Sequence, residues 1–444
     1  VPLRESAMEP FEVVISESQE RMLAIVEPKK AEEVLEFTER YGLVGAVIGR
    51  VADHGELRVK DSGEVVGSVP AEHLTDAPVY ERDVARPPYL DEVERLDLTT
   101  IPEQKNYNEI LLRMLAHPNL CSRRSIFEQY DHQVGTDTVV LPGADAAVMR
   151  IKGTPLGFAA TTDGRGRHCY LDPRGGGAAT VAEAYRNLAC VGAEPVAVTD
   201  CLNFGSPEKP EGYYQLATCI EGMAEACEAL GTPVVSGNVS LYNETEAGAV
   251  YPTPVVGMVG VFEDVSRHAT PGFKREGDIV VAVRSGGRCS LAGSDYLEII
   301  HRKVAGKPPE PDLAAEKKLS DLVRHLIEQG LIDTAHDISR GGEIIALTEM
   351  ARAGGLGVEY EEVEIKPLIN EQGGGRADVA LFGENGASFL IAVPESHWND
   401  LQRALGDVPY ENVARVGGAS IKVGDLIDVE LEELREAYEQ DLFS

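Results

Sequence analysis

The sequence predicts a folded α/β or α+β protein with two or three domains. The chain has 444 residues, which is too many for a single hydrophobic core. Its apolar content is 43%, and its 45 glycines and 25 prolines indicate many loops. Short apolar runs typical of buried strands alternate along the chain with longer segments of helical periodicity.

The middle of the chain contains most of the strand patterns. Strands are expected at 146–151, 157–162, 195–199, 233–235 and 255–262. The helical patterns are spread more widely, and helices are expected at 108–116, 178–190, 213–230, 313–329, 341–353 and 431–439. Gly231 is expected to end the third of these helices, because glycine readily adopts the left-handed conformation common at helix C-termini.

Composition excludes several classes of protein. The formal net charge is −33 and the pI is about 4.7, which argues against a surface for nucleic acid or anionic membranes. No apolar run of about 18 residues is present, so no membrane-spanning helix is expected. The seven cysteines are irregularly placed and form no CxxC pair, which favours reduced thiols and a cytoplasmic location.

Two strand–helix–strand patterns have the same order and similar spacing. The segments are 22–26, 29–41 and 48–51 in the first copy, and 389–393, 395–405 and 413–416 in the second. Glu17 and Glu384 precede the two patterns in equivalent places. Coincidence is the alternative explanation. If the repeat is real, the first copy is the truncated tail of a domain that the second copy contains more fully.

The repeat suggests a division of the chain into four parts. The expected parts are a domain tail at 1–80, a connector with a helix at 81–133, a strand-rich domain at 134–264 and a last domain at 265–444. Arg86-Pro87-Pro88 lies in the connector and breaks regular structure.

Small polar residues follow two of the expected strands. Asp200 ends the strand at 195–199, and Gly237, Asn238 and Ser240 follow the apolar run at 233–235. Glycine allows a ligand to approach the main chain closely, and the polar side chains offer oxygens to phosphate or Mg²⁺. The alternatives are an ordinary polar turn and, for Asp200, a turn or helix cap.

A second set of candidates is more scattered. Glu183 and Asn187 are four residues apart and therefore share one face of a helix, although a solvated face is the alternative. Asp163 ends a strand, where a hairpin turn is equally consistent. Asp337 could reach a metal ion, and Ser339 could cap a helix or bind phosphate. The glycine run at 175–177 could hold phosphate on its amides.

Several well-known nucleotide and metal motifs are missing from the sequence. It contains no zinc-ligand spacing, Walker A loop, GxSxG elbow or dinucleotide-binding fingerprint. Scattered Asp, Asn, Glu and Gly at strand ends indicate instead the binding of a Mg²⁺–nucleotide without a P-loop.

Five segments resemble one enzyme family. The segments SESQERML, YDHQVGT, VTDCLNFG, SGNVSLYNE and AHDISRGG are similar to motifs in the second half of small, multi-subunit phosphoribosylformylglycinamidine synthase, also called formylglycinamide ribonucleotide amidotransferase. The resemblance covers essentially the whole chain. It implies the AIR-synthetase-like fold, in which an ATP-binding α/β domain is paired with a second α/β domain and the pair occurs twice. In these terms, 1–80 and 265–444 belong to C-domains and 134–264 is an N-domain.

The resemblance also implies a reaction in purine biosynthesis. ATP, formylglycinamide ribonucleotide and ammonia give formylglycinamidine ribonucleotide, ADP and phosphate, with Mg²⁺ at the phosphates. The ammonia comes from glutamine through a separate glutaminase subunit, and a small accessory subunit bridges the two.

Site residues are carried over by motif. Glu17, Ser18 and Gln19 match the substrate-binding ESQ segment, and Ser240 matches a further substrate contact. Asp200 and Gly237 match ATP-binding positions, and Asn238 matches a Mg²⁺ ligand. A possible auxiliary nucleotide–Mg²⁺ site comprises Asp163, Glu183, Asn187, Asp337 and Ser339.

One departure from the family pattern limits these expectations. The catalytic histidine, the proton-accepting histidine and most Mg²⁺ carboxylates of the family lie in the first half, and their motifs are absent from this sequence. We therefore expect no catalytic residue in this chain and no activity without a missing N-terminal half. The alternatives are a non-catalytic nucleotide-binding scaffold, or another ATP-dependent member of the superfamily such as selenophosphate synthetase or thiamine-phosphate kinase.

Overall fold

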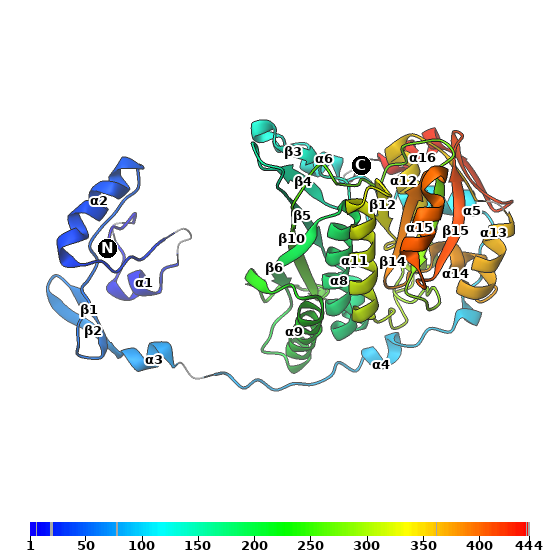
Figure 1. Ribbon diagram of the computed structural model, residues 1–444. Coiled ribbons are helices and arrows are strands. Elements are labelled where there is room, and N and C mark those ends of the chain that lie inside the picture. The colour runs from blue at the N-terminus through cyan, green and yellow to red at the C-terminus, as the bar shows by residue number, and fades with distance from the viewer. Residues whose placement is uncertain (6, 18–20, 77–78, 361, 441, 443–444) are drawn as a thin grey trace. The chain divides into compact units, whose positions relative to one another are not determined.

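The computed structural model consists of two compact units, Val1–Glu81 and Arg82–Ser444 (Figure 1). It describes all residues except 6, 18–20, 77–78, 361, 441 and 443–444, and it does not describe the side chains of 362–364.

The first unit is small and open. Its elements are α1 (Pro10–Ile15), a 3-10 helix (Pro28–Lys30), α2 (Ala31–Arg40), β1 (Glu56–Asp61), β2 (Glu64–Pro70) and α3 (Ala71–Thr75). The two strands form an antiparallel hairpin. None of the described residues up to Glu81 is buried, and Met22 and Val44 are 95% and 85% exposed. The described part of this unit therefore has no hydrophobic core of its own.

The helix of the first repeat copy forms as expected, but its flanking strands do not. Residues 22–26 and 48–51 have no regular secondary structure, whereas their counterparts in the second unit lie in β14 (Ser388–Val393) and β15 (Tyr410–Val416). A strand requires partners for its backbone N–H and C=O groups. In the second unit, the neighbouring strand β11 (Ile279–Arg284) supplies these partners to both β14 and β15.

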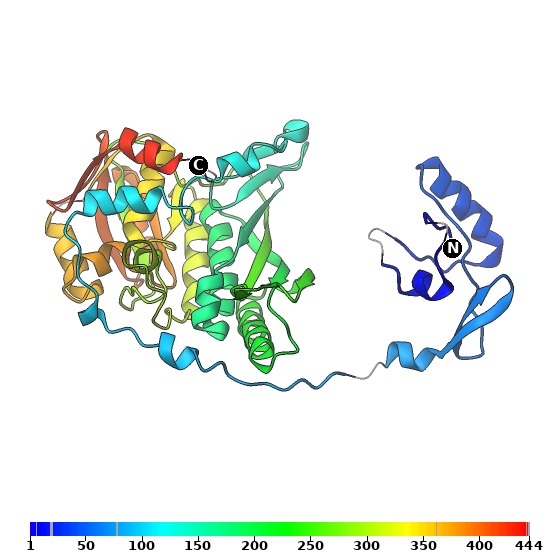
Figure 2. The same ribbon diagram turned by 180° about the vertical axis from the view of Figure 1, so that it is seen from behind.

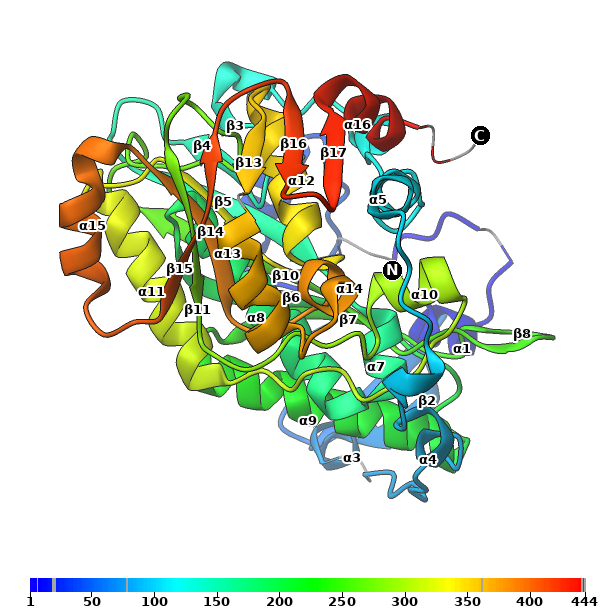
Figure 3. The ribbon, with the colours of Figure 1, turned by 90° about the vertical axis from the view of Figure 1, so that its right-hand side faces the viewer.

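The first sheet of the second unit has six strands in the order β3-β4-β5-β10-β6-β7. The bounds are β3 Thr138–Val140, β4 Ala147–Arg150, β5 Gly157–Asp163, β6 Glu194–Asn203, β7 Val234–Ser240 and β10 Thr253–Phe262. All pairs are antiparallel except β6 and β7, which run parallel. The five strands expected in this region are therefore confirmed. A short hairpin, β8 (Glu244–Thr245) and β9 (Gly248–Ala249), follows β7, and Figure 3 shows β8 at the margin of the view.

Helices α7 (Gly166–Leu171), α8 (Pro173–Val191) and α9 (Pro210–Leu230) accompany this sheet. α8 contacts β5 and β10 and lies against α9. The glycine run at 175–177 lies inside the first turns of α8 and serves close packing. A Cβ atom on Gly176 would lie 2.5 Å from the Cys169 nitrogen, and one on Gly177 would lie 2.4 Å from the Cys219 carbonyl oxygen. These glycines thus bring α8 against its neighbours.

The second sheet has seven strands in the order β12-β14-β11-β15-β13-β16-β17. The remaining bounds are β12 Thr334–Asp337, β13 Val358–Tyr360, β16 Ser420–Val423 and β17 Ile427–Glu430. Every residue of β11 and β14 is buried, because both faces of this part of the sheet are covered. One core includes residues of α12 (Gly342–Gly354) and α14 (Ala377–Phe382), and another includes residues of α11 (Leu313–Glu328) and α15 (Trp398–Leu405).

Shorter helices complete the second unit. Their bounds are α4 Leu90–Val93, α5 Tyr107–Leu115, α6 Arg124–Phe127, α10 Asp295–His301, α13 Glu362–Pro367 and α16 Leu431–Tyr438, with 3-10 turns at Leu98–Thr100, Val134–Thr136 and Glu395–His397 and a π-helical segment at Leu368–Gln372. Figure 2 shows α5 beside α16, which it contacts. The hairpin β16–β17 followed by α16 has the same order as β1–β2 followed by α3, so the repeat extends beyond the segments that the sequence pattern revealed.

Among the described residues, no helix is both long and apolar enough to cross a membrane, as expected from the sequence.

Candidate functional site

The first candidate site lies along the C-terminal halves of β6 and β7. Asp200 and Gly237–Ser240 were expected to follow the strands, but they lie within them, because β6 continues to Asn203 and β7 to Ser240. The two strands run parallel, and Asp200 is paired with Gly237, Cys201 with Asn238 and Asn203 with Ser240. Ligands of α/β proteins commonly bind where the carboxyl ends of parallel strands meet. The structure therefore brings the predicted residues Asp200, Gly237, Asn238 and Ser240 onto two adjacent strands.

These four residues divide between the two faces of the sheet. Side chains alternate along a strand, so Asn238 and Ser240 share one face. The Asn238 Nδ2 atom donates a hydrogen bond to Ser240 Oγ at 3.1 Å. Asp200 lies on the opposite face with Gly237. Because β7 is the edge strand and is exposed along nearly its whole length, both faces are accessible in the second unit.

The carboxylate of Asp200 lies directly beside Gly237. A Cβ atom on Gly237 would be 2.3 Å from Asp200 Oδ1, so any larger residue would displace the carboxylate. Partial burial raises the pKa of Asp200, and a hydrogen bond from the Asn238 backbone opposes this rise. The absence of a side chain at 237 thus leaves room for the Asp200 carboxylate. From the sequence, this glycine was expected only to let a ligand approach the main chain closely.

The second candidate site is a cavity of about 390 Å³ inside the second unit. Helix α8 contributes Glu183 and Asn187, and the end of β12 with the loop that follows contributes Asp337 and Ser339. Asp163 ends β5 directly after Thr162, which also lines the cavity. Four of the five residues predicted for an auxiliary site therefore line one cavity, and Asp163 does not line it but lies close enough to Glu183 for the two carboxyl groups to interact. Glu183 is only 5% exposed, which excludes the solvated-face alternative.

Arginines already neutralise two of the acidic residues around the cavity. The Arg165 Nε atom lies 2.5 Å from a Glu183 oxygen, and its Nη1 lies 2.8 Å from Glu384 Oε2. Burial would raise the pKa of Glu183, but Arg165 and Arg186 outweigh it and hold that pKa below its ordinary value. The Arg186 Nε atom lies 3.4 Å from Asp337 Oδ2.

Burial makes the carboxyl groups of Asp337 and Asp163 resist ionisation, although Arg186 lies beside Asp337. Burial raises the pKa of Asp337 to about 6, with Arg186 opposing the rise and Glu183 reinforcing it. Burial and the nearby Glu183 carboxylate raise the pKa of Asp163 well above its ordinary value. Carboxyl groups that resist ionisation for this reason would be stabilised by an added cation.

Sequence reasoning missed a histidine in the same cavity. His336 Nδ1 lies 2.7 Å from Asp145 Oδ1, and Nε2 lies 3.0 Å from Glu349 Oε2. Burial disfavours the charged imidazole, but the two carboxylates outweigh it and hold the pKa of His336 well above its ordinary value. Asp145, His336 and Asp337 lie close enough together to hold a metal ion, and His336 would become a ligand only after losing its proton. The adjacency of His336 to Asp337 was visible in the sequence, but the folding of Asp145 against it was not.

The two glutamates of the repeat have very different surroundings. Glu17 is exposed in the first unit, and Ser18 and Gln19 lie outside the described residues. Glu384 is 2% exposed. Its Oε1 atom accepts hydrogen bonds from the backbone nitrogens of Asp295 and Gly341 at 3.1 and 3.2 Å. Glu384 is therefore saturated by protein donors.

Comparison with known proteins gives two kinds of match. The family model of the AIR synthase related protein, N-terminal domain, matches residues 143–262. The model of the C-terminal domain of the same family matches residues 1–62 and 275–423. The phosphoribosylformylglycinamidine synthase subunit PurL of Moorella thermoacetica is 48% identical over 450 residues, which are 100% of this chain and 60% of the relative. The chain thus spans about three fifths of the length of the curated relatives it matches.

Solved structures of PurL also match this chain. Thermotoga maritima PurL complexed with ATP is 30% identical, with a TM-score of 0.60 over 94% of this chain and 58% of that one. PurL of the same organism complexed with FGAR is 30% identical, with a TM-score of 0.59 over 94% and 56%. The resemblance seen in the motifs and the paired-domain fold are both confirmed. The chain belongs to the AIR synthase related protein family.

Proposed function

We propose that this chain is part of a phosphoribosylformylglycinamidine synthase, the ATP-dependent C–N ligase of purine biosynthesis. The observation that carries the proposal is the parallel β6–β7 pair, whose carboxyl ends hold Asp200, Gly237, Asn238 and Ser240. Relatives with that enzyme name match the whole chain, and a relative from T. maritima was solved with ATP and with FGAR.

The reaction converts an amide into an amidine. The amide oxygen of formylglycinamide ribonucleotide attacks the γ-phosphorus of ATP, and the bond to ADP breaks. Phosphorylation is required because an amide is a poor electrophile. Ammonia then attacks the activated carbon, the C–O bond breaks, and phosphate leaves as a proton is lost from nitrogen.

The four residues of the β6–β7 pair would have different roles in binding the reactants and Mg²⁺. Asp200 and Gly237 would bind ATP, Ser240 would contact the ribonucleotide with Glu17, Ser18 and Gln19, and Asn238 would bind Mg²⁺. The Asn238 amide and the Ser240 hydroxyl lie on one face of the sheet and offer oxygen ligands of the kind that Mg²⁺ prefers, whereas the Asp200 carboxylate lies on the opposite face. Bound Mg²⁺ would neutralise phosphate charge.

Further protein is required to complete the enzyme. In the first unit, Met22 and Val44 are almost fully exposed, although such residues belong in a core. In the second unit, Val259 and Val261 of β10 are 39% and 42% exposed on the side opposite the buried Met258. A homologous N-terminal half would cover these surfaces and supply the catalytic histidines. Its further partners would be a glutaminase subunit and a small accessory subunit.

The four-part division of the chain is part of this proposal. The tail at 1–80 would complete the C-domain of that other half, and 134–264 and 265–444 would form the second pair of domains, joined through 81–133. The seven cysteines are all unpaired, which fits an enzyme of the reducing cytoplasm.

Ammonia-dependent ADP formation tests the proposal. The chain alone should release no ADP above background, and mixing it with the N-terminal part of a relative should restore turnover. Asp200→Ala and Asn238→Ala should each abolish that turnover without changing the melting temperature. Turnover by the isolated chain, or full activity of both variants, would contradict the proposal.

A structural role for the second cavity is favoured by its arginines. Arg165 and Arg186 occupy positions beside Glu183 and Asp337, where a Mg²⁺–nucleotide would otherwise supply positive charge. We therefore propose that these ion pairs give the cavity a structural role, and that an auxiliary nucleotide–Mg²⁺ would add to that role without taking part in the reaction. Glu183→Ala should then lower the melting temperature of the chain, while the ATP requirement of the reconstituted enzyme stays unchanged.

A further inference from the structure

The loops that leave β6 and β7 form one layer. The first loop covers 204–209 and the second covers 241–243. Phe204 N donates a hydrogen bond to the Ser240 carbonyl oxygen at 3.0 Å, and Tyr242 N donates to that of Gly205 at 3.2 Å. Asn243 N donates to the Phe204 carbonyl oxygen at 3.1 Å. The two loops therefore cannot move independently without breaking backbone hydrogen bonds.

Glu244 connects the second loop to two points of the first. Its Oε1 atom accepts a hydrogen bond from Ser206 N at 2.9 Å, and its Oε2 atom accepts one from Lys209 Nζ at 2.7 Å. Lys209 and the Ser206 amide together lower the pKa of Glu244, so the carboxylate is ionised at neutral pH. Charge-assisted bonds of this kind are shorter and stronger than neutral ones.

Glu244 lies at the surface of this layer, and the chain packs closely beside its carboxylate. A Cβ atom on Gly205 would lie 2.8 Å from Ala249 Cβ and 3.2 Å from Glu244 Oε1, so the first loop passes close to the carboxylate. Asn243 Nδ2 donates hydrogen bonds to the Ser240 and Phe204 carbonyl oxygens at 2.7 and 3.1 Å. Phe204 itself is 1% exposed and anchors the layer in the core.

We propose that Glu244 is a positioning residue for the ribonucleotide site. The inference rests on the proposed function of the β6–β7 site. Glu244 touches no reacting group in this arrangement. Its hydrogen bonds to Ser206 and Lys209 fix the loop that follows Ser240. The preceding residue of that loop, Asn243, donates to the Ser240 carbonyl oxygen, so the end of β7 that presents Asn238 is fixed with it. A displacement of about 1 Å at a binding group can lower turnover about a hundredfold.

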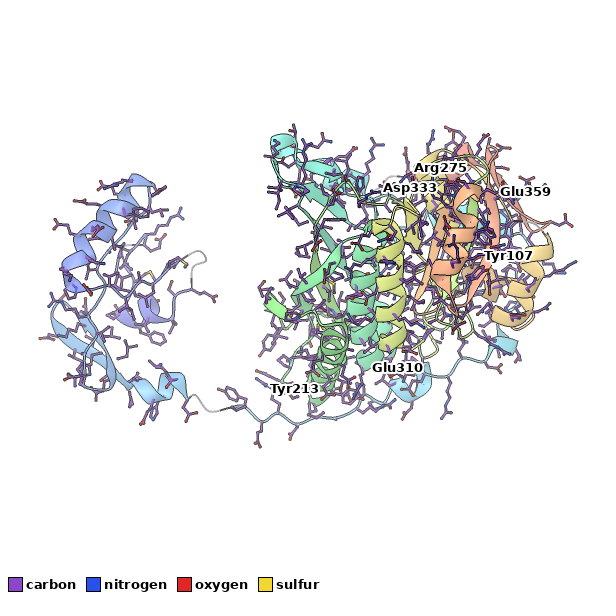
Figure 4. All side chains as sticks on the ribbon, in the orientation of Figure 1. Tyr107, Tyr213, Arg275, Glu310, Asp333 and Glu359 are labelled. Atoms are coloured by element: carbon purple, nitrogen blue, oxygen red, sulfur yellow. The ribbon has the colours of Figure 1, made fainter. Side chains whose placement is uncertain are left out.

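Three variants test this role in the reconstituted enzyme. Glu244→Ala removes both acceptors. Glu244→Gln keeps one oxygen for the Ser206 amide but loses the charge, and Lys209→Met removes only the ammonium. The matched control is Glu359→Ala, because Glu359 forms an exposed ion pair with Lys422 at 3.1 Å. Figure 4 shows Glu359 on the opposite side of the second unit from Tyr213, which belongs to the helix that follows the first loop.

The expected kinetic effect is selective. Glu244→Ala should lower kcat/KM for the ribonucleotide by about tenfold to a hundredfold, with a larger rise in KM for the ribonucleotide than for ATP. Glu244→Gln should recover most of this loss, and Lys209→Met should lie between the two. Glu359→Ala should match the wild type. Equal kinetics for Glu244→Ala and Glu359→Ala, or no recovery with Glu244→Gln, would overturn the proposal.

Hydrogen exchange provides a readout that does not depend on activity. In the chain itself, Glu244→Ala should speed amide exchange in 204–209 and 241–245 and leave the second sheet unchanged. Unchanged exchange in those segments would overturn the positioning role. If the wild-type complex forms no ADP while exchange responds as expected, the proposed function fails and the structural link through Glu244 stands.

Discussion

Replacing Gly237 with alanine should damage ATP binding without destabilising the fold. The new Cβ atom would lie 2.3 Å from Asp200 Oδ1, 2.7 Å from its Cγ and 3.0 Å from its Oδ2. Ordinary van der Waals contacts begin at about 3.4 Å, so the carboxylate must move by about 1 Å. Its short side chain can do so only by leaving the position beside β7.

The expected loss of kcat/KM for ATP is much larger than the expected change in the free energy of unfolding. A displacement of about 1 Å at a binding group is expected to lower kcat/KM for ATP by about a hundredfold. The free energy of unfolding should change by no more than about 1 kcal/mol, because β7 is an exposed edge strand and alanine costs less backbone entropy than glycine. A destabilised core would instead lower both quantities together.

The assay compares Gly237→Ala with Gly417→Ala in the reconstituted enzyme. Gly417 is a suitable control because a Cβ atom there would meet nothing within 4 Å. ADP formation at varied ATP concentration gives kcat/KM, and thermal unfolding of the chain gives stability. A kcat/KM for ATP that stays within twofold of the wild type would refute the argument, because Asp200 would then not require its present position.

Two further predictions concern the buried ion pairs of the second unit. Arg165→Met should lower the free energy of unfolding by about 3–5 kcal/mol, since it leaves the carboxylates of Glu183 and Glu384 buried without their cation. Lys422→Met at an exposed pair should leave the free energy of unfolding nearly unchanged. Denaturant titration measures both changes, and equal losses would contradict the burial argument. Arg165 and neighbouring cations outweigh burial and lower the pKa of Glu384, so its contribution to stability is present above the unfolded value near 4.5 and is lost as the pH falls below it. Glu384→Gln should therefore remove up to about 1.4 kcal/mol per pH unit from the acid limb of the stability profile, and an unchanged slope would show that Glu384 is not the titrating group.

Local patterns predicted most of the second unit correctly. The helix at 213–230 was expected within a few residues of α9, and the strand at 255–262 within two residues of β10, because periodicity and glycine caps are local signals. The failed strands at 22–26 and 48–51 show the limit of this reasoning. Their apolar residues have the right pattern, but a strand also needs a hydrogen-bonding neighbour, which no local pattern reports.

For the candidate sites, the residues could be predicted from the sequence, but their arrangement and their ion-pair partners could not. Glycine and polar residues next to two apolar runs could be identified from the sequence, but the strand ends expected at 199 and 235 were wrong, because β6 continues to Asn203 and β7 to Ser240. The alternation that places Asp200 and Asn238 on opposite faces depends on the register of pairing, which only the fold fixes. Arg165 and Arg186 were missed for a related reason. Each is an ordinary arginine in the sequence, and only the fold places each beside a carboxylate distant along the chain.

Glu17 and Glu384 hold equivalent places in the repeat but differ in exposure, and this difference bears on the proposed binding of the ribonucleotide by Glu17. Glu384 cannot bind a ligand, because Arg165 and two backbone amides already occupy its oxygens. Arg165 lies just after β5 in the six-stranded sheet, whereas Glu384 lies just before β14 in the seven-stranded sheet. The neighbouring sheet therefore decides whether this glutamate is available. For Glu17 to bind the ribonucleotide, the domain that packs against its copy must lack a cation equivalent to Arg165, so that the substrate supplies the donors that the protein supplies to Glu384.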